Sequence, residues 1–322
     1  MRALIMKLRP DGSREKAMVS NWPDPPAPVA NQVRTRTLLT GVTNGTERNN
    51  LLRGNYAIPD EALPAGCGYQ NVGEVIEVGP EVRDLAVGDV LFMSQDHAET
   101  CVVPEDALLV KLPPDVEPTH AALFGMAAVA LHDVRRAETK LGDRVLVVGA
   151  GPIGQFTAQA ARAAGAHVTV VDPNERRLAV AAECGAHRTI PVTGDDTWSG
   201  PIRAAGPYDV VFEDSGAAVL ENLIGRTWGQ SMLRPRGRLV LIAGRFDVNY
   251  PFNAAQGCEL TVLHAGHFTR DDLVVLCGLV TSGAVRVGPI LQDLVKPEEA
   301  GGIYDRLRDE PASLLGTVFD WR

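Results

Sequence analysis

The middle of the chain contains glycines at the spacing of a phosphate-binding turn. They form a G-x-G-x-x-G pattern in which Gly149, Gly151 and Gly154 are the glycines, and Pro152 and Ile153 lie between the last two. A continuous apolar run, 144–148, precedes the pattern, and an alanine-rich segment, 155–164, follows it. In a strand–turn–helix unit, such glycines allow a tight turn and a close approach to a pyrophosphate, and the helix N-terminus attracts the phosphates. We therefore predict a dinucleotide site; glycines that serve only packing are the alternative.

A carboxylate stands at the end of the strand that follows this unit. Asp172 comes directly after the apolar residues 167–171, where an acidic side chain accepts hydrogen bonds from the adenosine ribose hydroxyls. Because the same charge repels a 2′-phosphate, Asp172 favours NAD over NADP. Arg177 stands one turn into the next helical segment. It either reaches the ribose or a phosphate, or is a solvated helix residue.

A doubly wound parallel sheet is the element that would hold these residues. Strand-like segments alternate with helical ones at 144–148, 167–171, 188–191, 208–213, 237–243 and 259–264. Six strands with crossover helices place the ligand crevice at the carboxyl ends of the strands. Those ends carry the other candidates for the cofactor site, which are Ser215, Gly216, Ala243 and Gly244.

The first third of the chain has a different pattern. Residues 1–117 contain short strand-like runs, separated by turn signals such as Asn44-Gly45 and Gly88-Asp89. The segment after 264 is too short to form a domain alone, so we expect it to return to the first one. We predict an α/β protein with a β-rich domain over 1–125, completed by 265–322, and a dinucleotide-binding domain over 126–264.

Composition narrows the classes of function. The 322 residues are 45% hydrophobic, which excludes a disordered chain, and the formal net charge is −9. With no basic stretch or long apolar run, neither nucleic acid nor a membrane is an expected partner. The opening residues read as a strand and not as a signal peptide. Five scattered cysteines without a CxxC pair indicate neither a disulfide framework nor a structural zinc, and favour a cytoplasmic location.

Three stretches together resemble the medium-chain dehydrogenase/reductase superfamily. They are GEVIEVGPEVRDLAVGDV at 73–90, AALFGMAAVAL at 121–131 and LGDRVLVVGAGPIG at 141–154. The resemblance covers essentially the whole chain. It implies a GroES-like substrate domain, a Rossmann domain, a cleft between them, and a homodimer formed through the edges of the Rossmann sheets.

The chain departs from the zinc alcohol dehydrogenases of that superfamily at all three metal ligands. It has Thr43-Asn44 where they have a cysteine, Gly68-Tyr69-Gln70 where they have Gly-His-Glu, and Gly125-Met126-Ala127 where their third ligand stands. Their four-cysteine lobe is absent as well. We therefore predict no metal, and the chain is similar to a zinc-free branch with a Gly-Thr-Glu turn, here Gly45-Thr46-Glu47.

Without zinc, a side chain must move the proton that accompanies hydride transfer. His97 is the leading candidate, because its position lines the substrate pocket in the related fold and imidazole titrates near neutral pH; a half-exposed loop histidine is the alternative. Tyr69 replaces a ligand histidine, so its hydroxyl is expected in the same space unless it only packs. Thr46 matches the family's Ser/Thr that bonds the substrate hydroxyl. The remaining candidates are Asn44, Glu47, Gln70 and, near the nicotinamide or substrate, His267.

Three functions are compatible with these residues. The favoured one is a zinc-independent, NAD-dependent oxidoreductase acting on a secondary alcohol or ketone of polyol, sugar or cyclitol type. The second is an NAD(P)H-dependent enone or quinone reductase, against which Asp172 argues, because many such enzymes use NADPH. The third is an NAD(H)-binding protein without catalytic activity.

Overall fold

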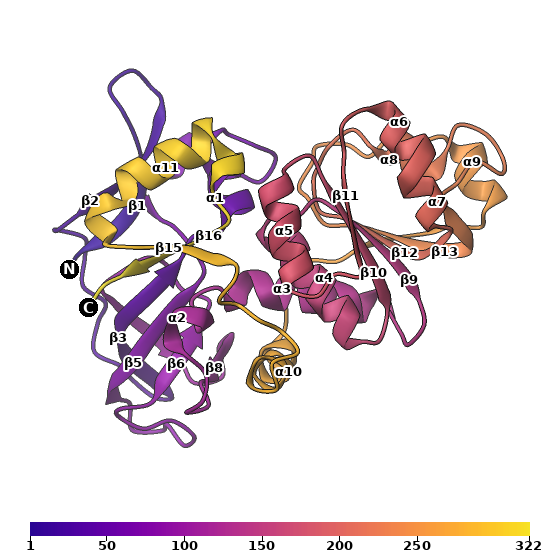
Figure 1. The fold of residues 1–322 in the computed structure, drawn as a ribbon. Coiled ribbons are helices and arrows are strands. Elements are labelled where there is room, and N and C mark those ends of the chain that lie inside the picture. Colours follow the sequence, from indigo (N-terminus) through magenta and orange to yellow (C-terminus); the bar gives the residue numbers. More distant parts are fainter. The chain divides into compact units, whose positions relative to one another are not determined.

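The structure, a computed structural model, describes all residues 1–322, which form two compact units (Figure 1). Unit 1 comprises Met1–Gly125, Thr269–Thr281 and Leu291–Arg322; unit 2 comprises Met126–Phe268 and Ser282–Ile290. The predicted fold class, a β-rich part plus a doubly wound sheet, is confirmed.

One part of the predicted domain division differs from these units. Unit 2 continues to residue 268, four residues beyond its predicted end, and residues 282–290 also belong to unit 2 and not to the segment expected to return to the first domain. The side chain of Gln159 holds them there, accepting a hydrogen bond from the Arg286 amide at 2.7 Å and donating to the Arg286 carbonyl at 3.2 Å.

Unit 1 contains two sheets. The smaller has the order β2-β1-β4 and consists of β1 (Ala3–Leu8), β2 (Arg14–Val19) and β4 (Ala65–Gly66). The larger has the order β15-β16-β3-β5-β6-β8, with β7 also paired to β3. Its strands are β3 (Gln32–Gly41), β5 (Asn71–Val78), β6 (Val90–Met93), β7 (Thr100–Pro104), β8 (Leu109–Lys111), β15 (Leu291–Val295) and β16 (Gly316–Asp320).

The helices of unit 1 are α1 (Asn44–Leu51), α2 (Pro118–Ala121), α10 (Arg270–Thr281) and α11 (Ala300–Asp309). The Asn44-Gly45 pair, expected to be a turn, is instead the first turn of α1. The Glu47 carboxylate explains the difference, because it accepts the Thr43 backbone N–H at 2.6 Å and so satisfies a donor at the helix N-terminus. α11 packs on β2, and the C-terminal segment thus closes the core around the first strands.

Unit 2 is built on one parallel sheet with the order β11-β10-β9-β12-β13-β14. The strands are β9 (Arg144–Val148), β10 (His167–Asp172), β11 (Arg188–Pro191), β12 (Tyr208–Glu213), β13 (Leu233–Leu241) and β14 (Thr261–His264). The order changes direction at β9, between β10 and β12, which is where such sheets bind ligands. The apolar run of β9 is buried on both faces, as expected of a central parallel strand.

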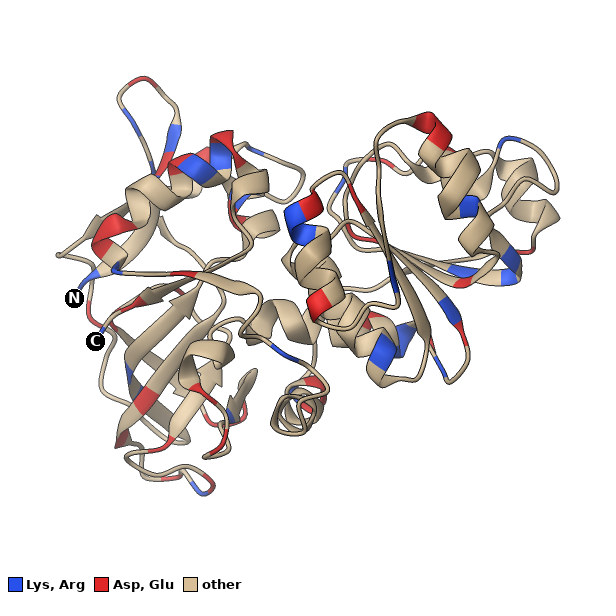
Figure 2. Ribbon diagram, viewed as in Figure 1, with Lys and Arg blue, Asp and Glu red and all other residues tan.

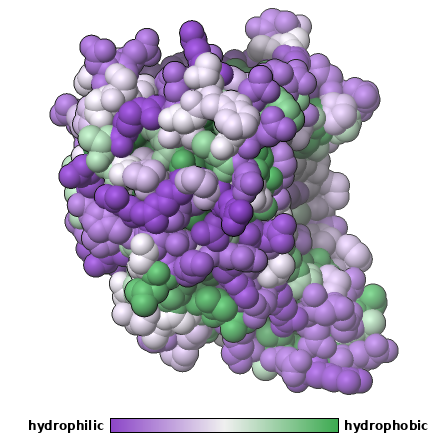
Figure 3. Space-filling view, turned by 90° about the vertical axis from the view of Figure 1, so that its right-hand side faces the viewer, coloured by the Kyte–Doolittle hydropathy of each residue, from purple (hydrophilic) through white to green (hydrophobic).

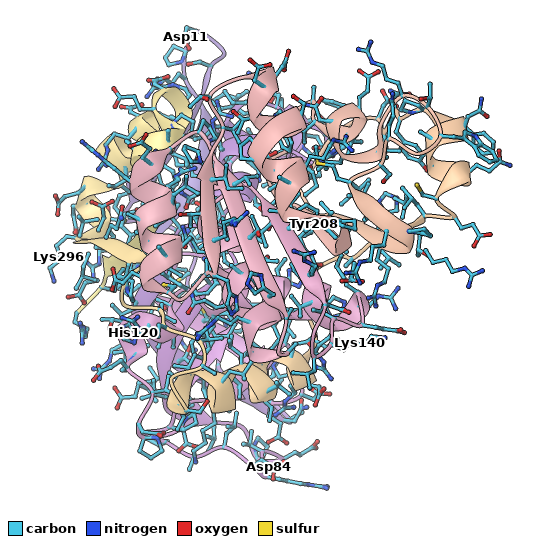
Figure 4. All side chains as sticks on the ribbon, turned by 45° about the vertical axis from the view of Figure 1, so that its right-hand side comes forward. Asp11, Asp84, His120, Lys140, Tyr208 and Lys296 are labelled. Carbon is cyan, nitrogen blue, oxygen red and sulfur yellow. The ribbon has the colours of Figure 1, made fainter.

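Helices cover this sheet. They are α3 (Phe124–Arg136, which begins in unit 1), α4 (Pro152–Ala163), α5 (Glu175–Glu183), α6 (Asp195–Thr197), α7 (Arg203–Ala205), α8 (Leu220–Ile224) and α9 (Phe252–Gly257). Tyr208 opens β12, and its buried hydroxyl donates to the Ile202 carbonyl at 2.8 Å (Figure 4). This bond ties the start of β12 to the turn that precedes α7.

The surface carries mixed charge. Basic and acidic residues are interspersed over both units (Figure 2). Hydrophilic residues cover most of the face in Figure 3, where hydrophobic residues gather in a smaller patch. None of the helices is long and apolar enough to cross a membrane.

Candidate functional site

The glycine turn of unit 2 has a backbone that only glycine fits at two positions. Gly149 adopts a φ of +102°, in the left-handed region. A Cβ at Gly154 would overlap the carbonyl oxygen of Gly149, so α4 could not approach β9 so closely with any other residue. Gly151 is the N-cap of α4, and Pro152 occupies the first turn, where its missing N–H costs nothing. The turn therefore presents the N-terminus of α4 for an anionic group.

Asp172 is fixed beside this turn. Its Oδ2 accepts the Ala150 backbone N–H at 2.7 Å, and its Oδ1 accepts the Asn174 N–H at 2.7 Å. Each carboxylate oxygen can accept a second hydrogen bond, so the buried side chain retains capacity for a diol. Arg177 extends over the same place, because its Nη1 would lie 3.9 Å from a Cβ added at Gly151. Burial lowers the pKa of this guanidinium, and the neighbouring Asp172 opposes that shift.

The ends of β12 and β13 bring the other four cofactor candidates together. A Cβ at Gly216 would lie 3.3 Å from the Ala243 Cβ, and the Ala243 amide points to the Glu213 carbonyl at 3.4 Å. The Glu213 carboxylate accepts the backbone N–H groups of Ser215 and Gly216, each at 3.0 Å. Arg245, which follows Ala243-Gly244, forms an ion pair with the same carboxylate. Sequence reasoning missed Glu213 and Arg245, although their places beside the candidate loops were visible.

Asp214 is a second unexpected carboxyl in this region. Both of its oxygens are buried and neither makes a hydrogen bond of standard geometry, although the Thr157 hydroxyl lies near enough to oppose the shift in the pKa of Asp214. One of them would lie 3.4 Å from a Cβ added at Gly154, so the group sits against the start of α4. Burial, followed by the charges of Asp133 and Glu213, raises the pKa of Asp214 well above its ordinary value. Burial therefore favours the neutral form of this carboxyl to a higher pH than in an exposed aspartate.

Four polar side chains lie together in unit 1. They come from the two sequence segments in which the resemblance would place metal ligands. Gln70 Nε2 donates to Thr43 Oγ1 at 3.1 Å, and the Tyr69 hydroxyl is hydrogen-bonded by Thr43 and Thr46. A Cβ at Gly125 would lie 3.0 Å from the Tyr69 ring, so the position of the third family ligand borders the same group. We call Thr43, Thr46, Tyr69 and Gln70 the hydroxyl cluster. Burial raises the pKa of Tyr69 to about 12, so the phenol stays protonated at neutral pH.

Beneath the hydroxyl cluster lies a buried charged group around Glu47. This carboxylate is 1% exposed and pairs with Lys16, while the Tyr304 hydroxyl donates to it at 2.7 Å. Burial alone would raise the pKa of Glu47, but Lys16 and His97 outweigh it and hold the pKa well below its ordinary value. Glu47 is thus an ionised anchor inside the core.

His97 belongs to this buried group, which corrects the expectation that it lines a pocket. The side chain is 0% exposed, and Nε2 lies 3.3 Å from Glu47 Oε1. The ring packs edge-on against Phe319, and its Nδ1 is buried without a hydrogen-bond partner. In this position the imidazole cannot touch a substrate directly, because the core of unit 1 encloses it.

Two other candidates lie outside the hydroxyl cluster. Asn44 donates to the Leu314 carbonyl at 3.3 Å and so ties α1 to the C-terminal segment. His267 lies in unit 2, with φ +62°, and its ring stacks on Phe268 at 4.5 Å. Burial lowers the pKa of His267.

Comparisons with known proteins fit this geometry. Residues 152–272 match a family model described as zinc-binding dehydrogenase. The chain is 27% identical to 2-dehydro-3-deoxy-L-galactonate 5-dehydrogenase of Pseudoalteromonas atlantica, over 91% of this chain and 92% of that one. It is 28% identical to sorbitol dehydrogenase 1 of Saccharomyces cerevisiae, over 75% and 78%. The fold matches 2R,3R-butanediol dehydrogenase from Bacillus subtilis with a TM-score of 0.83 and 24% identity, covering 100% of this chain and 99% of that one.

The chain belongs to the medium-chain dehydrogenase/reductase superfamily. This dehydrogenase is therefore an oxidoreductase, and enzymes of its type use a nicotinamide dinucleotide.

The hydroxyl cluster of this dehydrogenase does not fit the zinc that the family model's description implies. Zinc takes thiolate, imidazole and carboxylate ligands, whereas the cluster offers neutral hydroxyl and amide groups that already bond one another. The nearest carboxylate, Glu47, is taken by Lys16, Tyr304 and the Thr43 amide. No group of three or more His, Cys, Asp or Glu side chains in the chain could hold a metal ion.

Proposed function

We propose that this protein is a zinc-independent, NAD-dependent dehydrogenase that transfers a hydride between the nicotinamide and a secondary alcohol or its ketone. The observation that carries the proposal is the hydroxyl cluster, which brings a protonated tyrosine, two threonines and the Gln70 amide together. The substrate class is a polyol, sugar or cyclitol, because hydroxyl and amide groups bind hydroxylated carbons well. Relatives named for sugar-acid and sorbitol oxidation support that class.

In this proposal unit 2 holds the dinucleotide. The glycine turn and the N-terminus of α4 bind the pyrophosphate, Asp172 binds the adenosine ribose diol, and Arg177 adds a positive charge at the turn. The loops after β12 and β13 contact the nicotinamide half. When bound, NAD supplies the hydride acceptor.

The Tyr69 hydroxyl is the group that we assign to the substrate oxygen. In ketone reduction the protonated phenol donates its proton to the substrate oxygen and is reprotonated from solvent through Thr46. In alcohol oxidation the alcohol proton leaves by the same path in reverse. Thr46 and Thr43 orient this hydroxyl. The buried charged group of Glu47, His97 and Lys16 fixes α1 in the core of unit 1. It acts on the reaction only through the position of the hydroxyl cluster.

We further propose a cytoplasmic homodimer. All five cysteines are free and buried, which suits a reducing compartment. β14 is an edge strand of the parallel sheet, and its unpaired side offers backbone groups to a second copy.

Elemental analysis and a substrate panel with NAD and NADP test the proposed function together. We expect no stoichiometric zinc, no loss of activity on chelation, and turnover of polyols or cyclitols with NAD. About one tightly held zinc per chain would contradict metal independence. Turnover of enones or quinones alone would favour the reductase alternative, and an NADH signal without any substrate would favour the non-catalytic binding protein.

A further inference from the structure

The Glu213 carboxylate bonds groups from two loops at once. Oε1 accepts the backbone N–H groups of Ser215 and Gly216 at 3.0 Å and also the Ser215 hydroxyl. Oε2 pairs with the guanidinium of Arg245. The loop after β12 is thus attached to the last residue of that strand, and the loop after β13 is attached to the same side chain.

Arg245 completes the link from the other side. Its Nε donates to the Ala243 carbonyl at 3.1 Å while Nη2 reaches Glu213, so the guanidinium fixes its own loop as it binds the carboxylate. The Glu213 side chain is 0% exposed and that of Arg245 is 16% exposed. Charge-assisted hydrogen bonds are strong in such a poorly solvated place, and leaving either charge alone is costly.

The position of the pair gives it a role beyond stability. The adjacent parallel strands β12 and β13 carry the two loops at their carboxyl ends, the edge of the sheet where dinucleotides bind. The glycine turn, in contrast, is held by Asp172 and by the approach of Gly154 to Gly149, and neither of these involves Glu213 or Arg245. The hydrogen bonds that hold the two halves of the site are therefore separate, although the halves are in contact, because a Cβ at Gly149 would lie 3.0 Å from the Ser215 nitrogen.

We propose that Glu213 and Arg245 are positioning residues that hold the loops after β12 and β13 in the geometry that binds the nicotinamide half of the cofactor. This inference rests on the proposed function, since it needs a dinucleotide in unit 2. The hydrogen bonds of Asp172 and the glycine turn do not include the pair, so loss of the pair should weaken recognition of the nicotinamide more than that of the adenosine half.

Binding of NADH and of ADP-ribose, which lacks the nicotinamide, separates the two halves. For Arg245→Met we expect the NADH Kd to rise about tenfold or more, because the loops lose their link, while the ADP-ribose Kd changes by less than about twofold. Glu213→Gln keeps an oxygen acceptor for Ser215 and Gly216 but weakens the bond to Arg245, so we expect a smaller loss. The double variant should lose less than the sum of the two, because no charge is then left buried and unpaired.

Matched variants and a stability measurement complete the test. Arg226→Met removes one partner of the exposed Arg226–Glu221 pair in the same unit and should leave both affinities unchanged. Arg245→Lys, followed by thermal unfolding, covers the case in which Arg245→Met does not fold; it keeps the charge but loses the bidentate reach. An equal loss of NADH and ADP-ribose affinity, or unchanged NADH affinity in a folded variant, would overturn the inference. A wild-type protein that binds ADP-ribose but neither NADH nor NADPH overturns the proposed function itself.

Discussion

The Tyr304 hydroxyl donates a 2.7 Å hydrogen bond to the carboxylate of Glu47, a residue 257 positions earlier in the chain. Lys16 binds the same oxygen, and its ammonium also lies 4.6 Å from the centre of the Tyr304 ring. The charge of Glu47 is therefore held by groups from β2, α1 and α11, which makes it a junction of the first and last parts of unit 1.

Replacing Lys16 by methionine should destabilise unit 1 strongly. The change leaves the Glu47 carboxylate buried beside a neutral side chain, for which a loss of about 3–5 kcal/mol is typical. Denaturant unfolding measures the effect. Lys7→Met is the matched control, since Lys7 is 40% exposed and pairs with Glu15 at 3.3 Å, and exposed pairs contribute at most about 1 kcal/mol. Equal losses in the two variants would show that the Glu47 junction does not depend on Lys16.

Asp214 should make the native protein less stable as the pH rises. Burial raises the pKa of Asp214, so the folded chain keeps a proton that the unfolded chain releases above about pH 4. Stability then falls with pH until the folded pKa is reached. Asp214→Asn removes this dependence, so its stability relative to wild type should increase as the pH rises above about 4. Urea unfolding at several pH values measures the difference.

The exposed loop residue Asp84 provides the control for Asp214 (Figure 4). Asp84→Asn should give a pH profile parallel to that of wild type, because its carboxyl remains solvated in both states. A parallel profile for Asp214→Asn as well would mean that Asp214 is ionised in the folded protein.

Asp172 should determine the choice of cofactor. We expect NADH to bind more tightly than NADPH, because the carboxylate bonds a ribose diol and repels a 2′-phosphate. Asp172→Ser should narrow or reverse the preference. Because Asp172 also accepts the Ala150 and Asn174 amides, Asp172→Asn is needed to separate charge from support of the turn. Fluorescence titrations that find NADPH preferred by the wild-type protein would rule out this role.

Tyr69→Phe should lower turnover more than His97→Asn does. Tyr69 belongs to the hydroxyl cluster, so loss of its hydroxyl is expected to reduce turnover by about 10²- to 10⁴-fold, as for a positioned acid or base. The His97 ring is fully buried, and its replacement should chiefly reduce stability. Steady-state rates over a range of pH measure both. The assignment is reversed if His97→Asn folds normally but loses most of its turnover and the pH dependence of that turnover near neutral pH. His97 would then be the acid or base, and Tyr69 would not.

The sequence pattern located the elements of unit 2 because its signals are local. The apolar run of β9, the glycine spacing and Asp172 all lie within one strand–turn–helix–strand unit, so the pattern was sufficient to predict them. The link between Glu213 and Arg245 spans two strands, and their pairing depends on the order of strands in the sheet. No local pattern contains that information.

The environment of His97 could not be predicted for a similar reason. β2 contains Arg14, Glu15 and Lys16, which on hydropathy alone belong at a surface, yet Arg14 and Lys16 are buried. Only tertiary contact supplies their partners: Lys16 meets Glu47, and Arg14 donates to the Asn50 carbonyl at 2.7 Å. A histidine in a polar sequence context therefore became part of a buried charged group.

The return of the chain to unit 1 has a consequence for protein synthesis. β16 pairs with β3, and Trp321 donates to Thr40 at 2.9 Å, so the larger sheet lacks the strand between β3 and β15 until residues 316–321 have left the ribosome. Residues 126–290 contain all of unit 2 and emerge earlier. Because domains fold as they emerge, unit 2 can form before Tyr304 is available to bond the Glu47 carboxylate. The nascent chain thus has a dinucleotide-binding unit before it has a finished substrate unit, and early ligand binding would stabilise only the former.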